Sequence, residues 1–181
     1  MSEQPLPLPA TVEPMPAPSP YTIRAAGLSD VPVLARLRYE FRAALDPAAE
    51  PEPDFLKRCQ EWMSARLATP GSWRCWVAEE AGTLAGTVWL LPVEKLPNPV
   101  GEPERHGYVS SLYVRPAFRG GGLGSELLAT CLAACEAEGF DAMFLWPTPR
   151  SRTLYLRHGF EVRQDLLERR FAPVPLHGGA A

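Results

Sequence analysis

The chain has 181 residues, of which 46% are hydrophobic and 22% are charged, and its formal net charge at pH 7 is −3. This length suits one well-filled domain and is short for two. The negative balance argues against a general nucleic-acid binder, whose affinity depends on clustered lysine and arginine, so we expect no nucleic-acid partner.

Four cysteines and three histidines are present, and no two cysteines have C-x-x-C spacing. We therefore expect no metal site. Cys131 and Cys135 lie four residues apart on one helical face, which indicates buried, reduced thiols and a cytoplasmic location. No secretion signal and no apolar run long enough to cross a bilayer are found, so we expect no membrane association.

The N-terminal third begins with seven prolines within residues 1–20, which predict a disordered tail. A proline-rich ligand for a partner domain is less favoured, because no aromatic or basic anchor adjoins these prolines. A short strand over 21–24 should follow, and then a helix capped by Ser29 or Asp30. An acidic loop over 46–54 separates this helix from a second one over 53–67.

The middle of the chain is rich in strand signals. Two apolar runs, 73–79 and 84–91, flank Ala81-Gly82 and predict a β-hairpin. Residues 92–107 hold four prolines and are predicted to form a long insertion. A central strand over 106–114 comes next and leads into a cluster of glycines.

After the glycines, apolar residues recur at three- and four-residue spacing and predict a helix from Leu123 to about Glu138. The expected fold is one α/β domain over 21–172, with a mixed, mostly antiparallel sheet of six or seven strands flanked by about four helices, and a disordered tail over 173–181. The other elements expected are a strand over 141–146, a short helix over 150–157 and closing strand segments at 160–162, 166–167 and 169–171.

The glycine turn between the central strand and the following helix is the clearest binding signal. Glycine admits positive φ and lets a ligand approach the main chain, and the first amides of a helix attract anions. We therefore expect a phosphate here. A P-loop is excluded because Ser125 follows Gly124 without a lysine, and a dinucleotide fingerprint is excluded because Ser125 stands where a third glycine is needed. A nucleotide-binding oxidoreductase is therefore disfavoured.

The turn reads Arg119-x-x-Gly122-x-Gly124 and follows Leu112-x-Val114. This pattern closely resembles the acyl-CoA-binding motif of the GCN5-related N-acetyltransferases. The resemblance covers nearly all of residues 21–171. It implies acetyl transfer from acetyl-CoA, as co-substrate, to a primary amine.

A second stretch resembles the late motif of the same family, in which a tyrosine on a short helix precedes Gly-Phe. Tyr155, Gly159 and Phe160 occupy the matching places. A tyrosine on an amphipathic helix is by itself more often a core residue than a catalytic one. Two motifs in the right order and on the right elements reverse that preference.

The resemblance implies roles for individual residues. Main-chain amides of the turn hold the pyrophosphate of CoA, and the strand before it pairs with the pantetheine arm. Tyr155 protonates the leaving sulfur, because a phenol of unperturbed pKa ~10 is a donor at neutral pH. The expected cofactor-binding residues are Leu112, Tyr113, Val114, Arg119, Gly120, Gly121, Gly122, Leu123, Gly124, Ser125 and Tyr155.

The position that carries the general base in many relatives differs in this chain. Many relatives have a glutamate where this chain has Ser110, and a serine hydroxyl is too weakly basic to act unaided. Ser110 and Ser111 are expected to orient a water that relays the proton to Glu104, His106 or another carboxylate, or else the amine arrives already neutral. Thr148 stands where an asparagine is frequent. A non-catalytic acyl-CoA-binding or regulatory module is therefore the main alternative function.

Three further expectations concern the surroundings of the site. His158 ends the short helix and is interpreted as a cap rather than as the base. By resemblance the acidic loop borders the acceptor cleft, so Glu50, Glu52 and Asp54 are expected to attract a cationic amine, with a solvated connection as the alternative. The expected partners are a small-molecule or peptide amine acceptor and, since dimers are common in the family, a second copy of the chain.

Overall fold

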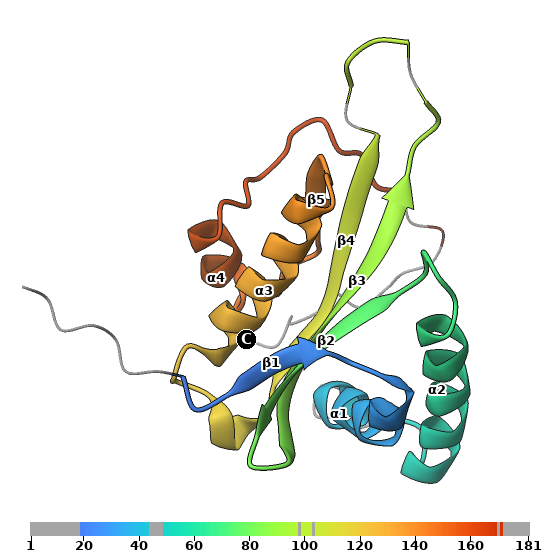
Figure 1. Cartoon of the computed structure of the whole chain (residues 1–181), viewed down its shortest axis with the longest axis vertical. Coiled ribbons are helices and arrows are strands. Elements are labelled where there is room, and N and C mark those ends of the chain that lie inside the picture. Colours follow the sequence, from blue (N-terminus) through green and yellow to red (C-terminus); the bar gives the residue numbers. More distant parts are fainter. Residues whose placement is uncertain (1–18, 44–48, 98, 103, 170, 172–181) are drawn as a thin grey trace, which may run out of the picture.

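The computed structural model describes residues 19–43, 49–97, 99–102, 104–169 and 171. One sheet runs through this part of the chain with its strands in sequence order (Figure 1). The first four strands are antiparallel, and the last pairs parallel to the fourth. The strands are β1 (Thr22–Ala25), β2 (Arg74–Glu80), β3 (Thr83–Glu94), β4 (Arg105–Val114) and β5 (Ala142–Phe144).

Helices cover both faces of the sheet, as Figure 1 shows, so the domain has three layers. α1 and α2 lie on one face, whereas α3 lies on the other with α4 beside it. This mixed α/β architecture confirms the expected fold class. The helices are α1 (Val31–Ala43), α2 (Glu52–Leu67), α3 (Leu123–Ala137) and α4 (Arg152–Arg157), with single 3-10 turns at η1 (Leu28–Asp30) and η2 (Pro116–Phe118).

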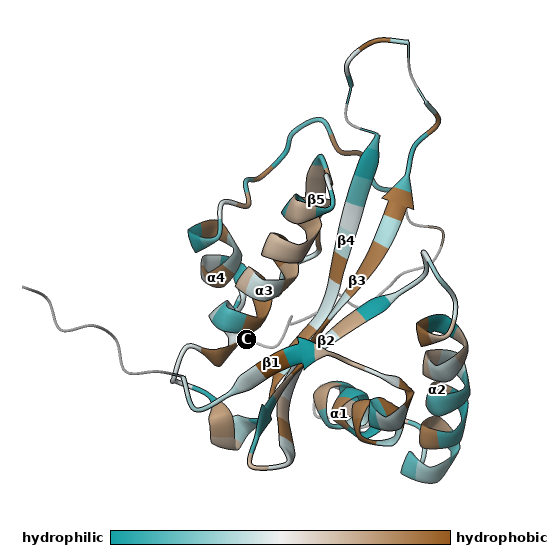
Figure 2. Ribbon diagram, viewed as in Figure 1, coloured by the Kyte–Doolittle hydropathy of each residue, from teal (hydrophilic) through white to brown (hydrophobic). Residues whose placement is uncertain are grey.

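Two apolar clusters hold these layers together. On one face, α3 buries Leu127, Leu128 and Cys131 against Val88 and Val109 of the central strands. Alternate residues of the same strands point to the other face, where they meet α1 and α2. Figure 2 shows the hydrophobic residues concentrated along these central strands, between the helical layers. Cys131 is a free buried thiol, as is Cys135, which confirms their expected place in the core.

The expected number of strands is too high for the described residues. Residues 160–162 and 166–167 form no strand, and Arg170 lies outside the described residues, so the closing segment at 169–171 is not followed to its end. Val162, Leu166 and Leu167 are exposed. Apolar residues alone do not make a strand, because a strand also needs a neighbour to pair with and a layer to cover it. The two predicted tails fall almost entirely outside the described residues.

The insertion predicted at 92–107 is partly strand. β3 continues to Glu94 and β4 begins at Arg105, with Pro92 opposite Gly107 in the ladder. The Lys95 amide also bonds the Glu104 carbonyl at 2.7 Å. The insertion is thus the projecting end of a long hairpin, seen at the top of Figure 1.

A carboxylate ties the start of α1 to the sheet. The Asp30 side chain, 10% exposed, accepts hydrogen bonds from Arg24 at 2.8 and 2.9 Å and from the Gly27 amide at 2.8 Å. Arg24 also donates to Glu79 of β2 at 2.9 Å. The hydrogen bonds from Arg24, helped by the Gly27 amide, hold the pKa of Asp30 below its ordinary value.

We expect Asp30→Asn to lower the free energy of unfolding at pH 7 by about 1–3 kcal/mol, because Arg24 loses one of its two carboxylate partners. The pKa of Asp30 is lower in the folded than in the unfolded state. Its contribution to stability is therefore complete above about pH 3.9, the unfolded pKa, and is lost as the pH falls through the folded pKa. Urea unfolding should therefore show a constant difference between the two proteins near neutral pH and a shrinking one in acid. Equal stabilities at pH 7 would contradict this role.

Candidate functional site

The chain passes from β4 to α3 through a glycine turn. Gly120 and Gly122 have φ of 90° and 85°, a left-handed backbone that disfavours other residues. The amides of residues 120–124 find no acceptor within the described part of the chain, whereas those of Ser125 and Glu126 both bond the Gly122 carbonyl. Consecutive free N–H groups therefore stand at the start of a 15-residue helix. This is the arrangement that binds phosphate anions.

Side chains around the turn brace it. Arg119 donates from Nε to the Val114 carbonyl at 2.8 Å, and its guanidinium lies 5.7 Å from the ring centre of Tyr113. Ser125 Oγ lies 2.5 Å from His158 Nε2, which joins the first turn of α3 to the end of α4. The structure thus brings the two sequence motifs side by side. The main-chain N–H of His158 also donates a hydrogen bond to the Tyr155 carbonyl at 3.0 Å, at the C-terminal end of α4. The interpretation of the His158 side chain as a dipole-compensating cap stays a prediction.

β4 contains a bulge just before the turn. Tyr113 pairs with Thr87 and Ser110 pairs with Trp89, so two residues of β4, Ser111 and Leu112, face a single residue of β3. Ser111 has φ of 51°, which is uncommon for a residue other than glycine. An extra residue bends a strand and re-aims its side chains. Ser111 thereby points its hydroxyl toward α1, within 3.4 Å of the Ser110 hydroxyl.

The far edge of β4 is open beyond its first residues. β5 pairs with β4 only from His106 to Tyr108, so residues 109–114 have a strand neighbour on the β3 side alone within the described structure. An unpaired strand edge can accept an extended ligand through main-chain hydrogen bonds. This edge leads directly into the glycine turn.

Some of the predicted cofactor-binding residues have buried side chains that cannot contact a ligand. Tyr113 is buried on the α1 face, where its ring stacks on Phe41 with centres 5.2 Å apart. Leu123 is the first residue of α3 and is buried in the core. Both residues can meet a ligand only through the main chain. Leu112, Val114 and the four glycines of the turn lie on the same path from the bulge to α3.

Tyr155 lies on α4, half-buried, with its ring edge-on to Phe160 at 5.7 Å. Burial raises the pKa of Tyr155 to about 12, with a smaller effect from Tyr108. The phenol is therefore protonated at neutral pH and can donate. Thr148 and Ser151 precede the helix, and their hydroxyl oxygens lie 2.9 Å apart. Thr148 thus fixes the start of α4.

The proton acceptors named from the sequence are far from Ser110. A strand rises about 3.3 Å per residue, which places His106 roughly 13 Å and Glu104 roughly 20 Å along the chain from Ser110. A single water does not bridge such gaps. The Glu104 amide bonds Asp141 at 2.9 Å, at the end of β4 remote from the glycine turn.

The acidic loop before α2 is partly accounted for by structure. Glu50 forms an ion pair with Arg58. Glu52 and Asp54 lie in the first turn of α2, where the positive end of the helix dipole attracts carboxylates. These contacts give the described part of the loop a structural role. Its attraction for a cationic acceptor stays a prediction.

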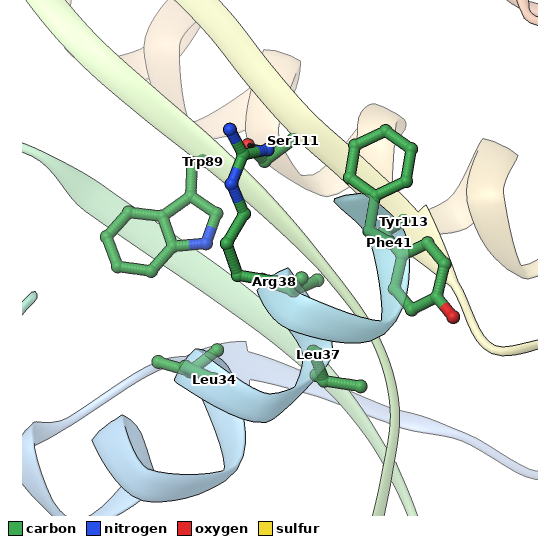
Figure 3. Close-up of a pocket in the computed structure, with 8 residues that line it drawn as sticks. Leu34, Leu37, Arg38, Phe41, Trp89, Ser111 and Tyr113 are labelled. Atoms are coloured by element: carbon green, nitrogen blue, oxygen red, sulfur yellow. Dashed lines mark hydrogen bonds between the residues drawn. The ribbon is translucent and has the colours of Figure 1, made fainter. Parts of the chain in front are cut away.

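Arg38 is a residue to which the sequence interpretation gave no role, although it lies beside the bulge. It points from α1 toward the bulge and donates from Nη1 to Ser111 Oγ at 2.9 Å (Figure 3). It helps to line a small pocket, together with side chains of α1, β3 and β4. The available signal was its place four residues after Leu34 and three before Phe41, which puts a cation on the buried stripe of α1.

The model of the Acetyltransferase (GNAT) family matches residues 35–160. The chain belongs to this family. Membership of the GNAT family supports acetyl transfer, with acetyl-CoA as co-substrate, as its general chemistry. A comparison with curated proteins gives no match.

Solved structures similar to this GNAT chain share its fold over most of their length. A GCN5-related N-acetyltransferase from Ralstonia eutropha is 25% identical, with a TM-score of 0.69 over 84% of this chain and 99% of that one. A predicted acetyltransferase from Clostridium acetobutylicum, solved with acetyl-CoA, is 23% identical, with a TM-score of 0.68 over 83% and 96%. An integron cassette protein from the Cole Harbour salt marsh metagenome is 31% identical, with a TM-score of 0.64 over 86% and 93%.

Two surveys of the described residues complete the site. No helix among them is both long and apolar enough to cross a bilayer. In the same part of the chain, no three His, Cys, Asp or Glu side chains are grouped in a way that could hold a metal ion.

We expect Gly122→Ala to weaken acetyl-CoA binding about 10-fold or more, because a left-handed alanine costs roughly 1–2 kcal/mol and its relaxation would misplace the turn amides. Gly82→Ala is the matched control. Gly82 has φ of 80° and equally open space around it, but it lies in the β2–β3 turn. Calorimetry should show a loss of affinity for the first variant alone. Equal affinities in both variants would remove the turn from the cofactor site.

Proposed function

We propose that this protein transfers an acetyl group from acetyl-CoA to a primary amine of a small-molecule or peptide acceptor, by direct attack in a ternary complex. The observation that carries the proposal is the row of free amides at residues 120–124, next to the open edge of β4. The free amides can bind a diphosphate, and the open edge of β4 can pair with an extended arm. CoA has both parts in that order.

The cofactor would lie along β4 and end at the bulge. Its pyrophosphate would accept hydrogen bonds from the turn amides, and its pantetheine arm would pair with the main chain near Val114 and Leu112. The thioester would then reach the neighbourhood of Leu112, where a main-chain N–H can polarise the carbonyl oxygen. The Clostridium acetobutylicum relative, which was solved with acetyl-CoA, supports this cofactor.

The transfer places three demands on the site. The amine nitrogen forms a bond to the thioester carbon, the carbonyl oxygen gains negative charge, and the C–S bond then breaks to release a thiolate. The acceptor nitrogen loses one proton, and the sulfur gains one. Main-chain amides can stabilise the charge on the oxygen, and the departing sulfur needs a hydrogen-bond donor and a proton.

Tyr155 is the proposed donor to the sulfur. Its pKa of about 12 lies above the ordinary value of a thiol, ~8.5, so the phenol holds its proton more tightly than a thiol does. Tyr155 therefore stabilises the departing thiolate by a hydrogen bond, and the proton that finally stays on sulfur is the one the acceptor nitrogen gives up. Ser110 and Ser111 would orient a water for that proton, which favours an amine that attacks in its neutral form.

Tyr155→Phe should lower kcat about 100-fold, because one donor to a developing anion is lost, while the acetyl-CoA Kd stays within about twofold. Tyr21→Phe, which deletes a phenol hydroxyl just before β1, is the matched control and should keep its kcat. Steady-state thiol release and calorimetry give the two numbers. An undiminished kcat in Tyr155→Phe would remove the donor role.

The pH profile should show a single ascending limb. Because the amine must be neutral, kcat/KM rises with pH through the pKa of the acceptor. No descending limb should come from Tyr155 below about pH 11, since its pKa is about 12. Measuring kcat/KM from about pH 6 to pH 10 checks this. A fall in rate near pH 8 or 9 would assign the proton donor to another group.

A non-catalytic acyl-CoA-binding module is the second candidate, because Ser110 stands where many relatives have a glutamate. Thiol release with a panel of amines separates the two candidates. Turnover of any acceptor supports the enzyme, and tight acetyl-CoA binding with no turnover supports the module. The cytoplasmic location and a homodimer remain predictions.

A further inference from the structure

Arg38 is a partly buried cation that has no acidic partner among the described residues. Its guanidinium donates from Nη1 to the Ser111 hydroxyl, and no Asp or Glu within the described ranges forms an ion pair with it. Burial, with a further contribution from Arg42, lowers the pKa of Arg38. A buried charge is costly unless it is paired, and a guanidinium carries five N–H donors. The site therefore leaves a positive charge and several donors unmatched.

The carboxylates around Arg38 are already engaged elsewhere. Glu40, the one carboxylate of α1, accepts two hydrogen bonds from Arg115 at 3.0 and 2.8 Å. Asp30 is held by Arg24, and Glu50 is paired with Arg58. The largest charge–charge contribution acting on Arg38 comes from the cation of Arg42. Among the described residues, the local charge around Arg38 is therefore positive.

The walls of this region are aromatic. The guanidinium of Arg38 lies 5.8 Å from the ring centre of Phe41, and Figure 3 places it between Trp89 on one side and Phe41 and Tyr113 on the other. The ring of Trp89 packs against that of Trp73, with centres 6.4 Å apart, and Trp73 in turn packs against Tyr108. Such walls exclude water and strengthen the attraction between a guanidinium and an anion.

The position of Arg38 relative to the proposed cofactor decides what it can bind. Ser111 belongs to the bulge, and the thioester is proposed to end beside the bulge. The enclosed space in the pocket is only about 10 Å³, roughly that of one water, so an anion would have to approach the guanidinium from the open side. The acceptor would enter from that side to reach the proposed thioester.

We propose that Arg38 binds a carboxylate or phosphate group of the acceptor, so that the substrates of this site are amines that carry a negative charge near the reacting nitrogen. This inference rests on the proposed acetyl transfer and narrows its substrate class. The anion supplies the missing partner of the guanidinium and anchors the amine beside the thioester. Arg38 is in this sense a specificity-determining residue.

Matched acceptor pairs test the proposal. One pair is an α-amino acid and its amide, which differ in the carboxylate, and another is phosphoethanolamine and ethanolamine, which differ in the phosphate. The wild-type protein should prefer the anionic member of at least one pair about 10-fold or more in kcat/KM, as expected for a charge-assisted hydrogen bond. Comparing the two pairs shows whether the site prefers a carboxylate or a phosphate.

Arg38→Gln should raise KM for the preferred anionic acceptor about 10- to 100-fold and change kcat/KM for its neutral counterpart less than about threefold. Arg38→Lys should be intermediate, because it keeps the charge without the planar fork. Arg36→Gln is the matched control, since Arg36 lies on the same helix but is exposed. The acetyl-CoA Kd should be unchanged in all three variants.

Two results would overturn the proposal. One is a wild-type protein that acetylates neutral or polycationic amines as well as anionic ones. The other is an equal loss for both members of a pair in Arg38→Gln, which would assign Arg38 to acetyl-CoA or to packing. If Arg38→Gln does not fold, Arg38→Lys, which keeps the charge without the planar fork, should still raise KM for the anionic member selectively, and a failure to do so counts against the proposal.

The proposed acetyl transfer can fail separately. In that case no amine is acetylated, yet inorganic phosphate or succinate should raise the thermal midpoint of the wild-type protein and not that of Arg38→Gln. Conversely, turnover of cationic amines alone would keep the acetyl transfer and reject the anion site.

Discussion

The bulge at Ser111 and Leu112 is the constraint on which the rest of the site depends. A strand in unbroken register pairs evenly with its neighbours and keeps its side chains in strict alternation. The extra residue breaks that regularity at one point of β4. β4 has strand neighbours on both edges only at residues 106–108, and from residue 109 through the bulge only β3 remains paired in the described structure. The open edge, the glycine turn and the cation on α1 all meet there.

The bulge would have little value without a fixed helix opposite it. α1 is tied to the sheet at both ends, by Arg24 and Asp30 near its start and by Glu40 and Arg115 near its last turn. Both are two-pronged contacts between a guanidinium and a carboxylate, which fix orientation as well as distance. Arg38 lies between these two clamps. Its position is therefore set by neighbours whose own charges are satisfied.

Local signals carried much of what the sequence could predict. The helix expected from Leu123 to about Glu138 is observed as Leu123–Ala137, because spaced glycines and a 3.6-residue period act within a short stretch. Features that depend on distant partners were missed. The bulge is defined by the register of β4 against β3, and the absence of strands at 160–162 and 166–167 reflects a missing neighbour. Arg38 gains its meaning only once α1 is packed against the bulge.

The last described quarter of the chain contributes little to the core. Cys135 is the final residue in the fully buried set, β5 contributes three residues, and α4 buries none. Segments with few buried contacts open at a small fraction of the global unfolding free energy. Backbone amides of α4 should therefore exchange with solvent deuterium long before those of β3. The tyrosine proposed to donate to the sulfur thus lies on a helix with no buried residue, while the turn proposed to hold the phosphates leads into α3, which buries five.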